Sequence, residues 1–212
     1  MRKIALGLVV LVSLLCVEAL ELTQEEIEYH DKRYKDGDSL FCAGLGQSYL
    51  LGIEGLGKDY KKAKFYLEKV CKKGNEKDEY FLEACTTLGL LYSRGGYGVP
   101  QDYKKALKLY NLACDKGDAG ACQNLGAMYY NGYGVPQDWV KGAGYVKRAC
   151  DAGSWMACSN VGIIYSNNGD YIMAAQYYKK ACEMGRNDSS AQGIPEQREI
   201  WQRACNMSSI SN

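Results

Sequence analysis

One short pattern recurs along the chain and constrains its fold more than any other feature. Residues 113–122 read Ala-Cys-Asp-Lys-Gly-Asp-Ala-Gly-Ala-Cys, and residues 149–158, which lie 36 positions later, read Ala-Cys-Asp-Ala-Gly-Ser-Trp-Met-Ala-Cys. In each copy the glycine suits the left-handed end of one helix, and Asp118 or Ser154 suits the cap of the next helix. The pattern therefore predicts a tight turn between two antiparallel helices.

Each copy also places one cysteine about one helical turn before the predicted turn and another about one helical turn after it. Packed helices lie ~8–10 Å apart, so the two sulfurs come within bonding distance. The disulfides predicted on this basis are Cys71–Cys85, Cys114–Cys122 and Cys150–Cys158. Zinc is the alternative use of these cysteines, but zinc sites prefer ligand pairs separated by two to four residues, and we expect no metal.

The spacing leaves three cysteines without a regular partner. Tyr34 occupies the position that would pair with Cys42, and Ser190 occupies the position that would pair with Cys182. A bond between Cys182 and Cys205 is a further expectation, because residues 201–205, near the end of a final helix expected over Pro195–Asn206, echo residues 145–150.

The N-terminal residues predict export from the cytoplasm. Arg2 and Lys3 precede the apolar run Ile4–Val17, and residues 1–19 read as a signal peptide. A membrane anchor is the alternative, but about 14 apolar residues fall short of the ~20 that span a bilayer. Lipid attachment at Cys16 is the second alternative, although the preceding Leu15 is bulkier than such processing prefers. We expect a secreted or periplasmic protein with no stable membrane span after cleavage, where regularly spaced cysteines form disulfides.

The rest of the chain divides into repeated units. We expect an N-terminal capping helix at 20–37, four helix-pair repeats at 38–74, 75–117, 118–153 and 154–185, and a C-terminal loop and capping helix at 186–212. A Leu-Gly-x-x-Tyr element opens each repeat, with Val161 in place of leucine in the last, and a Gly-Val-Pro-Gln-Asp bend follows it in the second and third repeats. Six extra residues around 75–80 are expected to lengthen the loop or the following helix.

The Leu-Gly-x-x-Tyr, Gly-Tyr-Gly-Val-Pro-Gln-Asp and Ala-Cys-x-x-Gly-x-x-x-Ala-Cys elements resemble Sel1-like repeats, relatives of the TPR. The cysteine spacing resembles the Helicobacter cysteine-rich protein family. The resemblance covers about residues 38–185. It implies an all-α, right-handed α/α solenoid of about four disulfide-stapled repeats with terminal capping helices. It also implies an activity, because members of that family are described as penicillin-binding proteins or β-lactamases.

The sequence itself does not carry the motifs of that chemistry. Serine β-lactamases need Ser-x-x-Lys together with Ser-Asp-Asn and Lys-Thr-Gly, and this chain has none of them. Zinc enzymes need several histidines, whereas His30 is the single histidine here. Cys42 has no neighbouring histidine, and a buried inert thiol is the better interpretation. We therefore expect no cofactor, and any hydrolysis would be a slow side activity.

A binding role has more support from the residues. Asn124 and Asn160 each precede the Leu/Val of the repeated element and lie 36 positions apart, so they are expected to recur at one height of a concave groove formed by the first helices. Such amides bind the backbone of an extended peptide regardless of its sequence. Solvated helix positions are the alternative. Further groove candidates are Tyr130, Asn131 and Arg94.

Three functions remain open from the sequence. The first is a scaffold that binds a peptide, a protein or a peptidoglycan fragment, the second is β-lactam binding or weak hydrolysis, and the third is a structural adaptor in an envelope complex. Nucleic acid is not an expected partner, because 26 basic residues nearly balance 25 acidic ones and no basic patch stands out.

Overall fold

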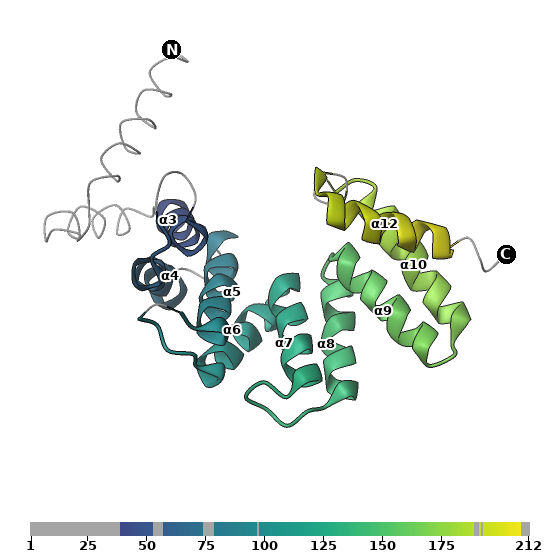
Figure 1. Ribbon diagram of the computed structural model, residues 1–212, viewed down its shortest axis with the longest axis horizontal. Coiled ribbons are helices and arrows are strands. Elements are labelled where there is room, and N and C mark those ends of the chain that lie inside the picture. Colours follow the sequence, from purple (N-terminus) through teal and green to yellow (C-terminus); the bar gives the residue numbers. More distant parts are fainter. Residues whose placement is uncertain are drawn as a thin grey trace, which may run out of the picture. The chain divides into compact units, whose positions relative to one another are not determined.

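The computed structural model describes residues 39–52, 57–73, 79–96, 98–188, 191 and 193–208. Its helices (Figure 1) are α3 Ser39–Leu51, α4 Tyr60–Lys73, α5 Glu79–Arg94, α6 Tyr103–Asp115, α7 Ala119–Asn131, α8 Trp139–Asp151, α9 Trp155–Asn167, α10 Tyr171–Gly185 and α12 Pro195–Ser208. The expected signal peptide, the N-terminal capping helix with His30, and Ser190 lie outside the described residues. No described helix has the length and apolar character that crossing a membrane requires.

Helix packing divides the chain into two compact units, one ending at Asp102 and one starting at Tyr103. In the first unit, α3 packs on α4 and both pack on α5. In the second unit, each helix from α6 to α10 packs on its successor in the chain, and α12 packs on α10. This order of neighbours confirms the predicted all-α architecture of consecutive helix pairs.

The repeated cysteine pattern forms the predicted turn. Gly117 and Gly153 adopt φ values of 95° and 103°, a left-handed conformation that costs glycine no steric strain. The Asp118 carboxylate accepts a hydrogen bond from the Ala121 backbone N–H at 2.6 Å, and the Ser154 hydroxyl accepts one from the Ala157 N–H at 3.2 Å. Both residues thereby cap the following helix, as the sequence predicts.

Four disulfides join the helices of the described chain. Cys114–Cys122 and Cys150–Cys158 each span one of these turns, with Cα–Cα distances of 4.7 and 4.5 Å. Cys71–Cys85 links α4 to α5 at 5.0 Å, and Cys182–Cys205 links α10 to α12 at 4.8 Å. These pairs are the ones expected from the sequence. Cys42 is buried and lies outside the disulfides. The six-residue insertion accompanies a longer helix, because α5 has 16 residues whereas α7 and α9 have 13.

The same backbone hydrogen bond recurs at the bend inside every repeat. The N–H of the aspartate before each second helix donates to the carbonyl of the tyrosine in the preceding first helix. The four pairs are Asp59–Tyr49 at 2.9 Å, Asp102–Tyr92 at 2.8 Å, Asp138–Tyr129 at 2.9 Å and Asp170–Tyr165 at 3.0 Å. The bond is present although the bend itself varies in length, so it sets the start of each second helix.

Helix packing explains the glycine and the tyrosine of the repeated Leu-Gly-x-x-Tyr element. A Cβ added at Gly126 would lie 2.7 Å from Val146 Cγ2, and one at Gly162 would lie 2.7 Å from Tyr178 Cε1. Glycine therefore lets the two helices of a pair approach closely. Next to this contact, Tyr129 stacks on Tyr145 with ring centroids 5.5 Å apart, and Tyr165 stacks on Tyr177 at 5.4 Å. Stacked pairs of this kind add about 0.5–1.5 kcal/mol beyond their buried area.

In the first unit, a side-chain hydrogen bond connects α4 to α5. The Tyr92 hydroxyl donates to Glu68 Oε1 at 2.6 Å, and Lys72 donates to the other carboxylate oxygen at 3.0 Å. Partial burial raises the pKa of Glu68, but the hydrogen bonds from Tyr92 and Lys72 outweigh burial and hold the pKa below its usual range. Burial, and after it the bond to Glu68, raises the pKa of Tyr92 well above its usual value.

Replacing Tyr92 with phenylalanine should lower the free energy of unfolding by about 1–2 kcal/mol at pH 7, because the bond involves a charged acceptor. The folded-state pKa of Glu68 is depressed, so the bond stabilises fully above about pH 5, and this stabilisation disappears as the pH falls below about 4. Urea unfolding of both proteins at pH 7 and pH 3 measures the effect. Tyr165→Phe is the control, since the Tyr165 hydroxyl has no hydrogen bond within the described residues. An equal loss at both pH values would contradict this assignment.

Candidate ligand-binding face

The proposed binding residues of the second unit lie on its first helices. Asn124 is half-buried on α7, and Asn160 is exposed on α9. Each follows a disulfide-bonded cysteine by two positions and precedes the buried Leu125 or Val161. Both side chains therefore occupy the same place in their repeats, beside the core rather than within it. Their role in ligand binding remains a prediction.

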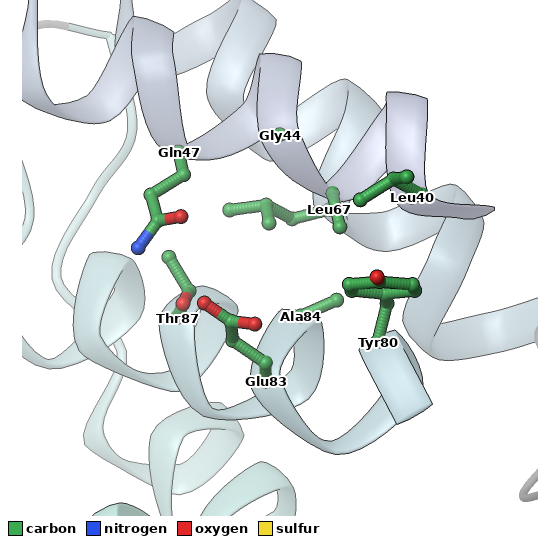
Figure 2. Close-up of a pocket in the computed structure, with 9 residues that line it drawn as sticks. Leu40, Gly44, Gln47, Leu67, Tyr80, Glu83, Ala84 and Thr87 are labelled. Atoms are coloured by element: carbon green, nitrogen blue, oxygen red, sulfur yellow. The ribbon is translucent and has the colours of Figure 1, made fainter. Parts of the chain in front are cut away.

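The equivalent positions of the first unit are Gly44 on α3 and Thr87 on α5, and both line a pocket. The pocket has a volume of about 110 Å³ and lies between the two first helices of that unit. Figure 2 shows Leu40, Gly44 and Gln47 on one wall, and Tyr80, Glu83, Ala84 and Thr87 on the facing wall, with Leu67 of α4 between them. In the first unit, the residues at the repeat position of Asn124 and Asn160 therefore line a cavity.

The pocket combines an apolar interior with a polar margin. Its apolar lining comes from Leu40, Ala43, Leu67 and Ala84 together with the ring of Tyr80. Leu67 is 1% exposed and belongs to the core, and Ala84 is buried as well. Gln47 and Glu83 are exposed, and Thr87 is half-buried. This arrangement resembles the general design of ligand sites, in which a few polar groups orient a ligand held by apolar surface.

The remaining groove candidates are Tyr130 and Asn131 of the second unit and Arg94 of the first unit. Tyr130 packs against α8, because a Cβ added at Gly142 would lie 2.7 Å from Tyr130 Cδ2. The Asn131 amide donates to the Ala127 carbonyl of its own helix at 2.8 Å. Arg94 is exposed at the end of α5 in the first unit. Tyr130 and Asn131 thus help to shape the end of α7, and their contact with a ligand stays a prediction.

A second unusual surface, which the sequence analysis did not identify, lies at the first turns of α8 and α10. Trp139 and Val140 are 65% and 85% exposed, and Tyr171 and Ile172 are 70% and 74% exposed. These pairs occupy equivalent positions directly after the capping aspartates, and we call them the apolar edge. The sequence did carry a signal for this apolar edge. Residues 59–61 and 102–104 read Asp-Tyr-Lys, whereas residues 138–140 and 170–172 read Asp-Trp-Val and Asp-Tyr-Ile.

Ion pairs connect the second helices of the second unit. Arg148 of α8 contacts Asp115 of α6 at 2.9 Å, and Lys180 of α10 contacts Asp151 of α8 at 3.1 Å. The hydrogen bond from Lys147 is the main cause that lowers the pKa of Asp151. All of these side chains are well exposed, so each pair contributes little stability. Within the described residues, no group of three or more His, Cys, Asp or Glu side chains is arranged to hold a metal ion.

Comparisons with known proteins agree with this architecture. The model of the Sel1 repeat family matches residues 39–75, 82–118, 119–154 and 155–185. The second match starts at residue 82, after the six-residue insertion. No curated protein matches the chain.

Two solved structures show a similar fold. One is c5321, a protective antigen present in uropathogenic Escherichia coli strains that displays an SLR fold. It shares 25% identity at a TM-score of 0.62, over 85% of this chain and 41% of that protein. The other is a Sel1 repeat protein from Oxalobacter formigenes, with 23% identity, a TM-score of 0.57, and coverage of 88% of this chain and 79% of that protein. The chain thus spans less than half the length of the Escherichia coli protein.

Proposed function

This chain belongs to the Sel1 repeat family, and from that membership we propose that it is an exported scaffold that binds an extended peptide or protein segment on its first helices. Repeat proteins of this kind expose one face of successive first helices, along which a ligand can contact several repeats. The disulfides make a rigid scaffold of units that otherwise contact only their neighbours.

The observation that carries this proposal is the pocket between α3 and α5. Gly44 and Thr87 line it, and they hold the repeat position that Asn124 and Asn160 hold in the second unit. One repeat position therefore meets a cavity in one unit and presents amides in the other. In the first unit a ligand side chain can enter the pocket. In the second unit the N–H and C=O groups of an extended backbone can pair with the amide side chains.

Four disulfides fit an oxidising compartment outside the cytoplasm. Together with the expected signal peptide at 1–19, they support export to the periplasm or the medium. In such a compartment a ligand would come from the cell envelope or from outside the cell, which favours peptides, proteins and peptidoglycan fragments over intracellular partners.

Replacing Asn124 and Asn160 together with alanine should weaken peptide binding roughly tenfold, since each lost hydrogen bond contributes about 0.5–1.5 kcal/mol. Random octapeptides displayed on phage and selected on the full oxidised chain supply the ligands, and fluorescence anisotropy of the enriched peptides measures their affinity. Gln176→Ala is the matched control, because Gln176 is an exposed amide on the second helix α10. Equal affinity of the double variant and the wild type would show that Asn124 and Asn160 do not bind the peptide.

The apolar edge supports a second candidate function, docking of a folded protein in an envelope complex. Exposed Trp and Tyr side chains are enriched among the residues that dominate protein interfaces, and four large apolar side chains here are more than half exposed. A Trp139→Ser/Tyr171→Ser variant separates the two functions. Complexes isolated from the periplasm by chemical cross-linking should lose a docked protein in this variant and keep it in Asn124→Ala/Asn160→Ala, whereas a peptide ligand should show the opposite dependence.

The β-lactam alternative receives no support from the pocket. A volume of about 110 Å³ is well below the 300–1,000 Å³ typical of sites that enclose a drug-sized ligand. Turnover of a chromogenic cephalosporin above background that persists after metal chelation would replace binding with catalysis as the main function.

A further inference from the structure

We infer that the pocket between α3 and α5 holds one aliphatic side chain of the ligand, and that Glu83 binds a cationic group on a neighbouring ligand residue. The ligand class is therefore a peptide in which a leucine-sized aliphatic residue adjoins lysine, arginine or a free amino terminus. This inference rests on the proposed peptide-binding function and specifies which peptides the chain would prefer.

The size and lining of the pocket define the apolar part of this ligand. The cavity of about 110 Å³ is too small to enclose a drug-sized molecule, so a single side chain is the suitable occupant. Leu67 forms the interior and is almost fully buried, which means that an occupant would contact the core of the unit directly. Leu40, which lines the same pocket, is 55% exposed, and a bound aliphatic group would cover part of it.

The absence of a side chain at Gly44 keeps this space open. Gly44 lies in the middle of α3, where glycine costs up to about 1 kcal/mol of helix stability relative to alanine. A Cβ added at Gly44 would meet no atom within 4 Å, so close helix packing does not require this glycine. Gly46, two residues later, is different, because a Cβ there would lie 2.6 Å from Leu67 Cγ.

Glu83 supplies the charge at the margin of the pocket. Its side chain is exposed on α5, and within the described residues it takes part in no ion pair. Gln47 and Thr87 add hydrogen-bonding groups on either side of the cavity (Figure 2). A carboxylate that makes no ion pair within the described residues and lies beside an apolar cavity complements a ligand whose aliphatic side chain is followed by a positive charge.

The test uses the phage-displayed octapeptides on the full oxidised chain and on two leucine variants. Gly44→Leu should fill the pocket, since Gly44 lines it and an added Cβ would meet no atom within 4 Å. Gly144→Leu is the matched control, because Gly144 is an exposed glycine of α8 whose added Cβ would also meet no atom. We expect wild type and Gly144→Leu to enrich peptides with an aliphatic residue next to a basic one. Gly44→Leu should lose that enrichment and bind a synthetic peptide of the enriched sequence at least tenfold more weakly.

The charge is tested on the same synthetic peptide. Glu83→Gln should weaken binding about two- to fivefold, as expected for an exposed ion pair, and should not change the affinity for the peptide with alanine in place of its basic residue.

The outcomes separate this inference from the proposed function. Peptides that depend on Asn124 and Asn160 but bind Gly44→Leu as well as wild type would overturn the pocket assignment and leave the binding function intact. Enriched peptides without the aliphatic and basic pair would overturn it as well. No enrichment by the wild-type chain would contradict both.

Discussion

Replacing Cys182 and Cys205 together with alanine should lower the free energy of unfolding by about 3.5 kcal/mol, the largest effect among the two-cysteine variants. The chain-entropy model makes the stabilisation grow with the length of the closed loop. Cys182 and Cys205 are separated by 23 positions, compared with 8 for Cys150 and Cys158. The same model gives about 2.5 kcal/mol for the shorter loop.

The contacts of α12 explain why this disulfide matters locally. Trp201 donates its indole N–H to the Cys182 carbonyl at 3.0 Å, and its ring lies against Gly185 of α10. Ala204 is the buried residue of α12, whereas most of the other side chains of that helix are exposed or half-buried. With so little buried surface, α12 should dissociate from α10 once the disulfide is removed.

Urea unfolding gives the free energies, and hydrogen exchange followed by mass spectrometry shows which helices open. The Cys182→Ala/Cys205→Ala variant should lose protection first in α12, whereas Cys150→Ala/Cys158→Ala should lose it around the turn between α8 and α9. Under reducing conditions the wild type and either variant should unfold at similar urea concentrations, which is the control for effects of alanine itself. A larger loss from the shorter loop would contradict the loop-length explanation.

Replacing Gly126 with leucine should lower the free energy of unfolding by about 3 kcal/mol, the upper end of the range for added bulk in a packed core. A Cβ at Gly126 would lie 2.7 Å from Val146 Cγ2 and 3.2 Å from the Gly142 backbone carbonyl oxygen. The side chain of Val146 can change its rotamer, but the backbone of α8 can move away only by separating α7 from α8. Further atoms of leucine would increase this separation.

Gly144→Leu is the internal comparison for this change as well. It lies on α8, two residues from Gly142, yet an added Cβ meets open space, and leucine is a better helix former than glycine. We expect Gly144→Leu to be neutral or stabilising by up to about 1 kcal/mol in urea unfolding. Similar stabilities for Gly126→Leu and Gly144→Leu would show that close approach of α7 and α8 is not what keeps glycine at position 126.

Features encoded within a few residues could be predicted from the sequence. The turn at Gly117, the caps at Asp118 and Ser154, and the Cys114–Cys122 bond all involve groups at most eight positions apart, so local geometry decides them. The repeat of this unit along the chain then implies helix pairs packed in order. Even the Cys182–Cys205 bond could be anticipated, because residues 201–205 copy the cysteine end of an earlier helix.

The candidate site was predictable only in part. The repeat position of Asn124 and Asn160 identified the first-helix face, but the pocket at the equivalent Gly44 and Thr87 depends on where α3, α4 and α5 meet. No pattern in the sequence shows that Leu67 forms its interior while Glu83 stays exposed beside it. The packing of the Tyr130 ring on Gly142 was likewise not visible in the sequence, and the role of Tyr130 in ligand binding stays a prediction.

The sequence alone determined the helices, their turns and the Cys114–Cys122 and Cys150–Cys158 pairs, because each follows from residues close together in the chain. The two wider pairs, Cys71–Cys85 and Cys182–Cys205, could be predicted only because the cysteine pattern repeats along the chain. Only the tertiary structure decided which side chains share a cavity and which remain exposed, as at the pocket and at Trp139 and Tyr171. Those properties depend on the distance and rotation between helices, which are set by the packing of side chains from separate repeats rather than by any one segment.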